Sequence, residues 1–100
     1  MRVLVTGAAG FIGRHVSAAL AKAGHEVLGL DVYEPPVGEW INADIRSPLS
    51  PVPGIDAVIH LAAIAAPREC DKDSARAFTV NVNGTLQVLR MALESGAKKV

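Results

Sequence analysis

Three glycines, Gly7, Gly10 and Gly13, follow a short apolar run at three-residue spacing and precede a helical pattern. A turn from a strand into a helix favours a residue that accepts positive φ, and glycine does so without a steric cost. The missing side chains also let a phosphate reach the backbone, where the N–H groups and the dipole of a helix start attract an anion. The residues predicted to form this phosphate-binding turn are Gly7, Ala9, Gly10, Phe11, Ile12 and Gly13.

An acidic residue, Asp31, ends the second apolar run, 18 residues past Gly13. In dinucleotide-binding folds, an acid about 20 residues beyond the glycines accepts hydrogen bonds from a ribose hydroxyl group. Glycines are common in tight turns and an aspartate at a strand end can simply start a turn, so the combination carries the prediction of a dinucleotide site. The next residues, 32–36, contain no basic side chain to pair with a 2′-phosphate, which favours NAD as the cofactor over NADP.

The remaining side chains with catalytic or metal-binding chemistry do not cluster in the sequence. His15, His25 and Cys70 have no partners at the spacing of metal ligands or of a nucleophile and its base, so we predict no metal site and no nucleophile. His60 lies in an apolar strand pattern, where a hydrogen-bonded core histidine is commoner than a catalytic one. Cys70 is the single cysteine, so an intrachain disulfide is excluded and a reducing, cytoplasmic setting is expected.

Strand and helix patterns alternate along the chain, as a parallel sheet requires. Helical spacing over residues 12–23 ends at Gly24, a suitable left-handed cap, and a longer helical pattern covers residues 74–95. Strand patterns cover residues 3–5, 27–30, 40–44 and 57–62, and residues 98–100 begin another. We predict one domain over residues 1–100, a doubly wound, parallel α/β sheet of the Rossmann type. Its strand order follows the first part of 3-2-1-4-5-6.

Bulk composition agrees with this fold and excludes several classes of partner. Half of the residues are hydrophobic but 4% are aromatic, so the core must be aliphatic, as in a buried parallel sheet. Ten basic and ten acidic residues give no net charge with which to attract nucleic acid or an anionic membrane. We therefore expect a small-molecule substrate as partner, with no nucleic acid and no membrane.

The run Val5-Thr6-Gly7-Ala8-Ala9-Gly10-Phe11-Ile12-Gly13 resembles the extended short-chain dehydrogenase/reductase superfamily, in its NAD-dependent epimerase/dehydratase group. Three further motifs fit in register, Asp44-Ile45, His60-Leu61-Ala62-Ala63 and Asn81-Val82-Asn83-Gly84-Thr85. The resemblance implies that Asp44 and Ile45 contact adenine and that the backbone of Leu61, Ala62 and Ala63 lines the cofactor. It also gives Asn81 a role in fixing the backbone near the active site. Without the resemblance, Asp44 is equally a strand end and Asn81 a solvated helix residue.

One segment departs from the family pattern. The resembled proteins carry a helix between the third and fourth strands, whereas residues 47–54 here contain three prolines. Proline removes a backbone donor and clashes with the preceding turn, so at most about one helical turn can form there. We expect this face of the sheet to be thinly covered and the adenine end to be less enclosed.

The catalytic residues that the resemblance implies are absent from the chain. The family uses a Tyr-x-x-x-Lys pair, but Tyr33 is the single tyrosine and Val37 stands four residues later. We predict no catalytic residue and no activity in these 100 residues. We expect them to be the front of a protein roughly two to three times longer.

The resemblance implies that the longer protein is an epimerase, dehydratase or related dehydrogenase of sugar nucleotides, and a homodimer through the long helix. The exposed helix and sheet edge of the isolated chain favour self-association or instability. The alternative class is a non-catalytic dinucleotide-binding module or redox sensor on the same fold. A weaker alternative is an unrelated Rossmann domain, such as a flavin reductase.

Overall fold

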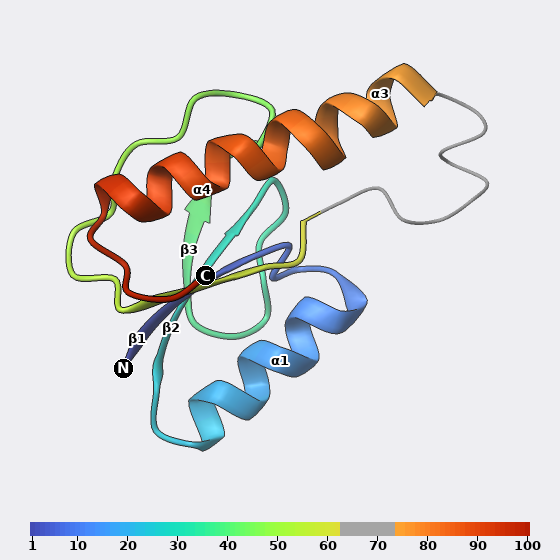
Figure 1. Cartoon of the computed structure of the whole chain (residues 1–100). Helices are drawn as coiled ribbons and strands as arrows, with labels where there is room; N and C mark the ends of the chain where they lie inside the picture. Colours follow the sequence, from blue (N-terminus) through green and yellow to red (C-terminus); the bar gives the residue numbers. More distant parts are fainter. Residues whose placement is uncertain (63–73) are drawn as a thin grey trace.

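A parallel sheet with helices on both faces forms the framework of the protein (Figure 1). The computed structural model describes residues 1–62 and 74–100. In chain order its elements are β1 (Arg2–Thr6), α1 (Phe11–Lys22), β2 (Glu26–Asp31), β3 (Glu39–Asn42), β4 (Ala57–His60), α3 (Ser74–Phe78), the π-helical turn η1 (Thr79–Asn83) and α4 (Gly84–Glu94). The strands lie in the order β3-β2-β1-β4, and every pairing is parallel. The predicted fold class is confirmed.

The carboxyl ends of the strands meet at one edge of the sheet. Thr6 at the end of β1 pairs with Leu30 of β2 on one side and with His60 of β4 on the other. Open parallel sheets bind ligands beyond these ends, at the point where the strand order reverses. Here that point lies between β1 and β4, and the loop that follows β1 carries the predicted phosphate-binding glycines.

Two predicted strand ends and the long helix need correction. The fourth strand ends at His60, two residues early, because the Ala62 N–H donates to the Thr6 hydroxyl instead of continuing the ladder (3.1 Å). The third strand ends at Asn42, and Asp44 instead begins a turn closed by its carbonyl and the Ser47 N–H (3.0 Å). The predicted helix over residues 74–95 contains a π-helical turn, η1, between α3 and α4.

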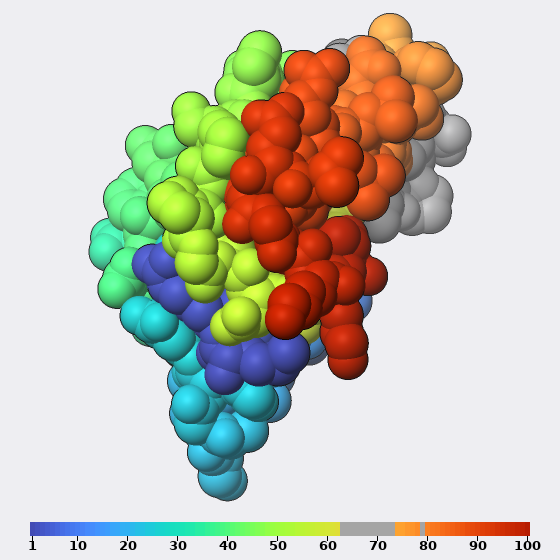
Figure 2. Space-filling view, turned by 60° about the vertical axis from the view of Figure 1, so that its left-hand side comes forward, coloured from blue at the N-terminus to red at the C-terminus, as the bar shows by residue number. Residues whose placement is uncertain are grey.

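The face of the sheet under α4 contains the larger core. Strand residues Leu4, Leu28 and Val58 pack there against Val88 and Met91 of α4, which are fully buried. The proline-rich connection lies on this same face, and Figure 2 shows α4 lying beside it. The connection has no helix, as predicted. The expectation of thin cover is wrong, because hydrophobic side chains of the connection complete the core, namely Ile45, Leu49, Val52 and Ile55.

The opposite face, under α1, contains a smaller cluster. It consists of Val3, Val5, Ala8 and Val27, with Leu20 of α1 packed against it. The buried residues of α1 itself are Gly13 and Ser17. Ile12 begins the apolar spacing of this helix, but the residue is 61% exposed. Gly13 turns toward the sheet instead, because the absence of a side chain there lets the helix approach.

The end of α1 and the last residues of the chain agree with the predicted helix cap and the predicted start of another strand. Gly24 follows α1 with a φ of 92°, the left-handed conformation expected of a cap. Lys99 forms one parallel bridge to Ala57 of β4, where the start of another strand was expected. Within the two described ranges, we find no helix that is both long and apolar enough to span a bilayer.

Candidate functional site

The glycine loop between β1 and α1 is a tight turn closed by its own backbone. Gly7 has a φ of 71°, which disfavours any other residue, and its N–H donates to the Leu30 carbonyl (3.0 Å). The Gly7 carbonyl accepts the Gly10 N–H at 3.1 Å. A Cβ on Gly13 would lie 2.0 Å from that same carbonyl oxygen. Gly13 therefore lets the first turn of α1 rest directly on the loop.

Gly10 differs from the other two glycines because its missing side chain leaves space. A Cβ built there meets one heavy atom outside its chain neighbours within 4 Å, the Gly7 oxygen at 3.3 Å. Gly10 is also the N-cap of α1, so it brings no side-chain cap, and the first turn contains no acidic residue. The start of α1 thus has an open cradle in which no carboxylate of its first turn competes for the N–H groups.

The Asp31 carboxylate is fixed beside this loop. Its Oδ2 accepts the Ala9 N–H at 3.0 Å, and its Oδ1 accepts the Tyr33 N–H at 3.1 Å. Each carboxylate oxygen has capacity for two hydrogen bonds, so these two contacts leave acceptor sites for a ligand hydroxyl. The bond from Ala9 ties the acid at the end of β2 to the loop after β1.

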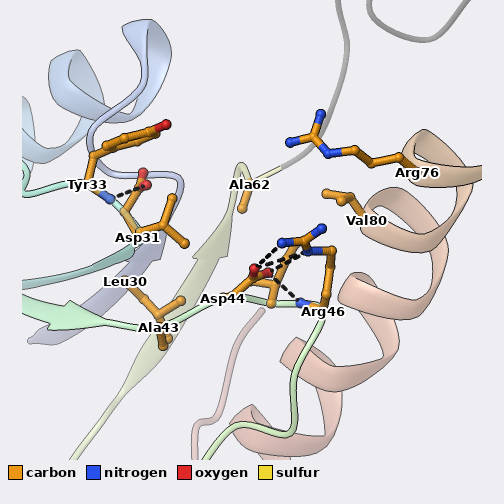
Figure 3. Close-up of a pocket in the computed structure, with 11 residues that line it drawn as sticks. Leu30, Asp31, Tyr33, Ala43, Asp44, Arg46, Ala62, Arg76 and Val80 are labelled. Carbon is orange, nitrogen blue, oxygen red and sulfur yellow. Dashed lines mark hydrogen bonds and ion pairs between the residues drawn. The ribbon is translucent and has the colours of Figure 1, made fainter. Parts of the chain in front are cut away.

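A pocket of about 370 Å³ opens beside Asp31 (Figure 3). One wall comes from the end of β2, the floor from the segment after β3, and the other wall from α3 and η1. The lining residues are Leu30, Asp31, Val32, Tyr33, Ala43, Asp44, Ile45, Arg46, Ala62, Arg76 and Val80. Its walls combine aliphatic side chains with a few polar groups, as is usual for small-molecule sites.

Asp44 and Arg46 form a close ion pair at the floor of this pocket. The Arg46 Nη2 lies 2.6 Å from Asp44 Oδ2, and the Arg46 backbone N–H donates to Oδ1 at 2.9 Å. These side-chain hydrogen bonds hold the pKa of the Asp44 carboxyl below its usual value. Asp44 is therefore a carboxylate near neutral pH, with more of its acceptor capacity already used than that of Asp31.

Ile45 and Gly84 set the distance between the pocket and α4. The Ile45 side chain is buried in the core under the helix, although the residue also lines the pocket. A Cβ on Gly84 would lie 2.5 Å from Ile45 Cδ1. The missing side chain at Gly84 thus lets α4 lie directly on the residue that carries one edge of the pocket.

The structure brings many of the predicted site residues together at one edge of the sheet. Asp31, Asp44, Ile45 and Ala62 line the pocket. The glycine loop adjoins it, since Ala9 bonds to Asp31 and a Cβ on Gly7 would lie 2.8 Å from Ala62 N. At the start of α1, Phe11 and Ile12 are exposed and can contribute their backbone.

Two predicted residues beyond the glycine loop, Leu61 and Asn81, do not line the pocket. Leu61 lies between His60 and Ala62, and its N–H donates to Thr6 Oγ1 at 3.0 Å. Asn81 lies in η1, where its carbonyl accepts the Thr85 hydroxyl at 2.6 Å, a contact that fits a role in fixing the backbone. Ala63 lies outside the described residues. The cofactor contacts of all these residues remain predictions.

Several lining residues were missed by the sequence analysis. Val32 and Tyr33 follow Asp31 directly, so their place near the site could have been inferred from the strand end. Arg46 is two residues past Asp44 and could have been suspected as its charge partner. Arg76 and Val80 reach the pocket from the long helical segment, and no local pattern marks them.

Comparison with known proteins agrees with this geometry. The sequence profile of the NAD dependent epimerase/dehydratase family matches residues 3–100. The chain is similar to the UDP-glucose-4-epimerase of Stenotrophomonas maltophila, whose crystal structure contains NAD and formylated UDP-arabinopyranose. The TM-score is 0.86 and the sequence identity 30%, covering 97% of this chain and 34% of the epimerase.

Curated relatives include enzymes of more than one activity. UDP-glucuronic acid decarboxylase 1 of Danio rerio is 34% identical over 109 residues, covering 97% of this chain and 26% of the relative. A 3-beta-hydroxysteroid dehydrogenase of Mycolicibacterium neoaurum is 31% identical over 112 residues, covering 98% and 30%. The chain thus spans about a quarter to a third of the length of these three proteins.

Proposed function

The chain belongs to the NAD-dependent epimerase/dehydratase family and is an NAD-binding region of that type, and from this premise we propose that the protein acts on a nucleotide sugar. The observation that carries the NAD-binding part is the bond from the Ala9 N–H to Asp31 Oδ2, at 3.0 Å. It joins a phosphate cradle to a ribose acceptor, with a pocket for a base beside them.

Each part of the site has a distinct role toward the cofactor. The start of α1 at Gly10 holds the pyrophosphate, the free acceptor sites of Asp31 hold the adenosine ribose, and the pocket holds adenine. The Asp44 carboxylate and the Ile45 backbone are placed to meet the edge of the base. When bound, NAD supplies a reversible hydride acceptor. The start of α1, Asp31 and the pocket bind and orient the cofactor. We assign no described residue a role in proton transfer.

The nucleotide-sugar substrate is supported by the relatives. A structure with a formylated UDP-pentose and a UDP-glucuronic acid decarboxylase are both similar over nearly the whole of this chain. The steroid dehydrogenase relative supports a second candidate substrate class, the steroid alcohols. We also propose a cytoplasmic setting, because the chain has a single cysteine and so cannot form an intrachain disulfide.

Cofactor choice tests the role of Asp31. Titration calorimetry of the full chain should show tighter binding of NAD than of NADP, because the carboxylate accepts a ribose diol and repels a 2′-phosphate. Asp31→Ala should weaken NAD by about tenfold or more and reduce the preference. Glu34→Ala, which removes an exposed acid three residues away, should leave both affinities unchanged. Equal affinity of the wild type for both cofactors would contradict the assignment.

Incubation with nucleotide sugars tests the substrate class. The intact protein should convert at least one UDP- or other nucleoside-diphosphate sugar in an NAD-dependent manner, detected by NMR of the product or by the absorbance of NADH. Turnover of a steroid alcohol with no turnover of any nucleotide sugar would contradict the proposal. Tight NAD binding without turnover of either class would favour the redox-sensor alternative.

We also propose that the intact protein is a homodimer through the long helix. Along η1 and α4, the side chains of Val82, Leu86, Leu89 and Leu93 are between 43% and 80% exposed, as predicted, and they follow helical spacing. An apolar stripe of this kind is typical of an interface. Sedimentation should show a dimer that Leu86→Arg dissociates and that Arg90→Glu, an exposed change beside the stripe, does not. A wild-type monomer would exclude the interface.

A further inference from the structure

The Thr6 hydroxyl, at the carboxyl end of β1, has a complete set of hydrogen bonds. Thr6 is fully buried, and its Oγ1 accepts the backbone N–H of Leu61 at 3.0 Å and of Ala62 at 3.1 Å. A hydroxyl group has two acceptor positions and one donor. Both acceptor positions face backbone N–H groups, which can only donate, and the Leu61 N–H also donates to the Thr6 carbonyl oxygen at 3.2 Å. The Thr6 hydrogen must therefore point at its third neighbour, His60 Nδ1, at 2.6 Å.

This direction fixes the protonation of the His60 ring. An Nδ1 atom that accepts a hydrogen bond carries no proton, so the neutral ring must carry its proton on Nε2. Nε2 lies 3.0 Å from Thr85 Oγ1, to which it donates. The Thr85 hydroxyl in turn donates to the Asn81 carbonyl at 2.6 Å. Each hydrogen bond along this path is therefore donated in the same direction, from β1 toward η1.

The path joins three segments that border the cofactor site. Its first member holds Ala62, which lines the pocket and lies against Gly7 of the phosphate loop. Its last member is a carbonyl in η1, the π-helical turn that also carries Val80 of the pocket wall. A π-helical turn inside a helix often marks a functional position. His60 is the member of this path that joins the sheet to α4.

We propose that Thr6, His60 and Thr85 are positioning residues that hold the Leu61–Ala62 backbone and the π-helical turn in register with the glycine loop. His60 acts as a fixed, neutral Nε2–H tautomer and does not exchange protons with a substrate. A doubly protonated ring would turn an N–H toward the Thr6 hydrogen and break the path at its start. Burial, which lowers the pKa of His60, agrees with the neutral form.

The tautomer can be observed without any ligand. In the full chain labelled with ¹⁵N at histidine, the two ring nitrogens of His60 should show the pattern of a protonated Nε2 and an unprotonated Nδ1. Thr6→Val, which removes the donor to Nδ1, should convert this pattern into a mixture of tautomers. Thr6→Ser should retain the wild-type pattern. A wild-type ring protonated at Nδ1, or a rapidly exchanging mixture, would overturn the proposal.

The positioning role rests on the proposed NAD site and needs a second measurement. Thr85→Val should weaken NAD binding about fivefold to tenfold, and Thr85→Ser should restore it. Ser95→Ala is the matched control, because it removes the Ser95 Oγ contact with Val52 N (2.8 Å) at the far end of α4. It should change neither NAD affinity nor the His60 spectrum, even where it lowers the melting temperature as much as Thr85→Val does.

The two measurements separate the possible failures. If wild-type protein does not bind NAD, the proposed function fails, whereas the tautomer spectrum still decides whether the path exists. If Thr85→Val binds NAD like wild type, or if Ser95→Ala weakens it equally, the positioning role is overturned and the contacts contribute to stability alone.

Discussion

The two faces of the sheet are built on different principles. Under α4, long aliphatic side chains such as Met91 are fully buried against strand residues such as Leu4. Under α1, the helix turns a glycine and a serine toward the sheet. Apolar burial holds α4 in place, whereas close backbone approach holds α1, because its first turn lies directly on the glycine loop. The difference shows that a close backbone contact can displace the apolar stripe of a helix from the core.

Gly13→Val should have the largest effect and would break the α1 face. The new Cβ would lie 2.0 Å from the Gly7 oxygen, a backbone atom that no rotamer change can move. We expect a loss of more than about 3 kcal/mol in unfolding free energy, together with the loss of NAD binding. Denaturant unfolding and calorimetry measure the two effects. Ala19→Val, on the exposed side of α1, is the control, and an equal effect of the two changes would refute the close-approach argument.

Met91→Ala should have the next largest effect and would test the α4 face. Truncating this fully buried side chain should lower the unfolding free energy by about 2–5 kcal/mol, since it removes apolar contacts and leaves a cavity. NAD affinity at a temperature where the variant is folded should stay within about twofold, because the pocket lining is unchanged. Arg90→Ala, at an exposed residue of α4 beside the stripe, should cost less than about 0.5 kcal/mol. A matching loss at Arg90 would show that the effect does not come from burial in the core.

Gly10→Val should separate binding from stability on the α1 side. Gly10 has a φ of −74° and a ψ of 175°, a conformation that valine adopts readily, and its Cβ would meet the Gly7 oxygen at 3.3 Å, a contact that a small shift of the loop relieves. We expect unfolding free energy to change by less than about 1 kcal/mol. NAD affinity should fall by about a hundredfold or more, because a branched side chain would occupy the cradle. Wild-type affinity in this variant would mean that the loop is not the phosphate site.

Mild acid should have the smallest effect, through His60, which joins the sheet to α4. Its folded pKa is lowered by burial, so the unfolded chain binds a proton more readily than the folded one. The stabilising contribution is complete above the unfolded pKa of about 6.5 and is lost as the pH falls through the folded pKa. Melting temperatures should therefore decline over this range in wild type and less in His60→Gln. An equal slope in both would place the titrating group elsewhere.

Local pattern was sufficient to predict the parts of the site that are close in sequence. The strand, the glycine turn and the helix start occupy consecutive residues, and Asp31 ends the next strand, so spacing alone indicated their chemistry. Ile12 begins the apolar spacing of α1 and yet is exposed, because the first turn directs Gly13 toward the loop. Arg76 was missed because folding across the sheet places it on the pocket wall. The contact of Thr6 with His60 spans 54 residues, and only strand register reveals it.

Gly84 affects the pocket because it has no side chain. Its missing side chain lets α4 rest on Ile45, and Ile45 forms part of the pocket edge. Any larger residue there would raise the helix by pushing against the Ile45 side chain, and the floor and the far wall of the pocket would separate. The depth of the proposed adenine pocket thus depends on a residue that does not line it. Substitutions at residue 84 would alter the spacing between the helix and the pocket floor without changing any side chain of the lining.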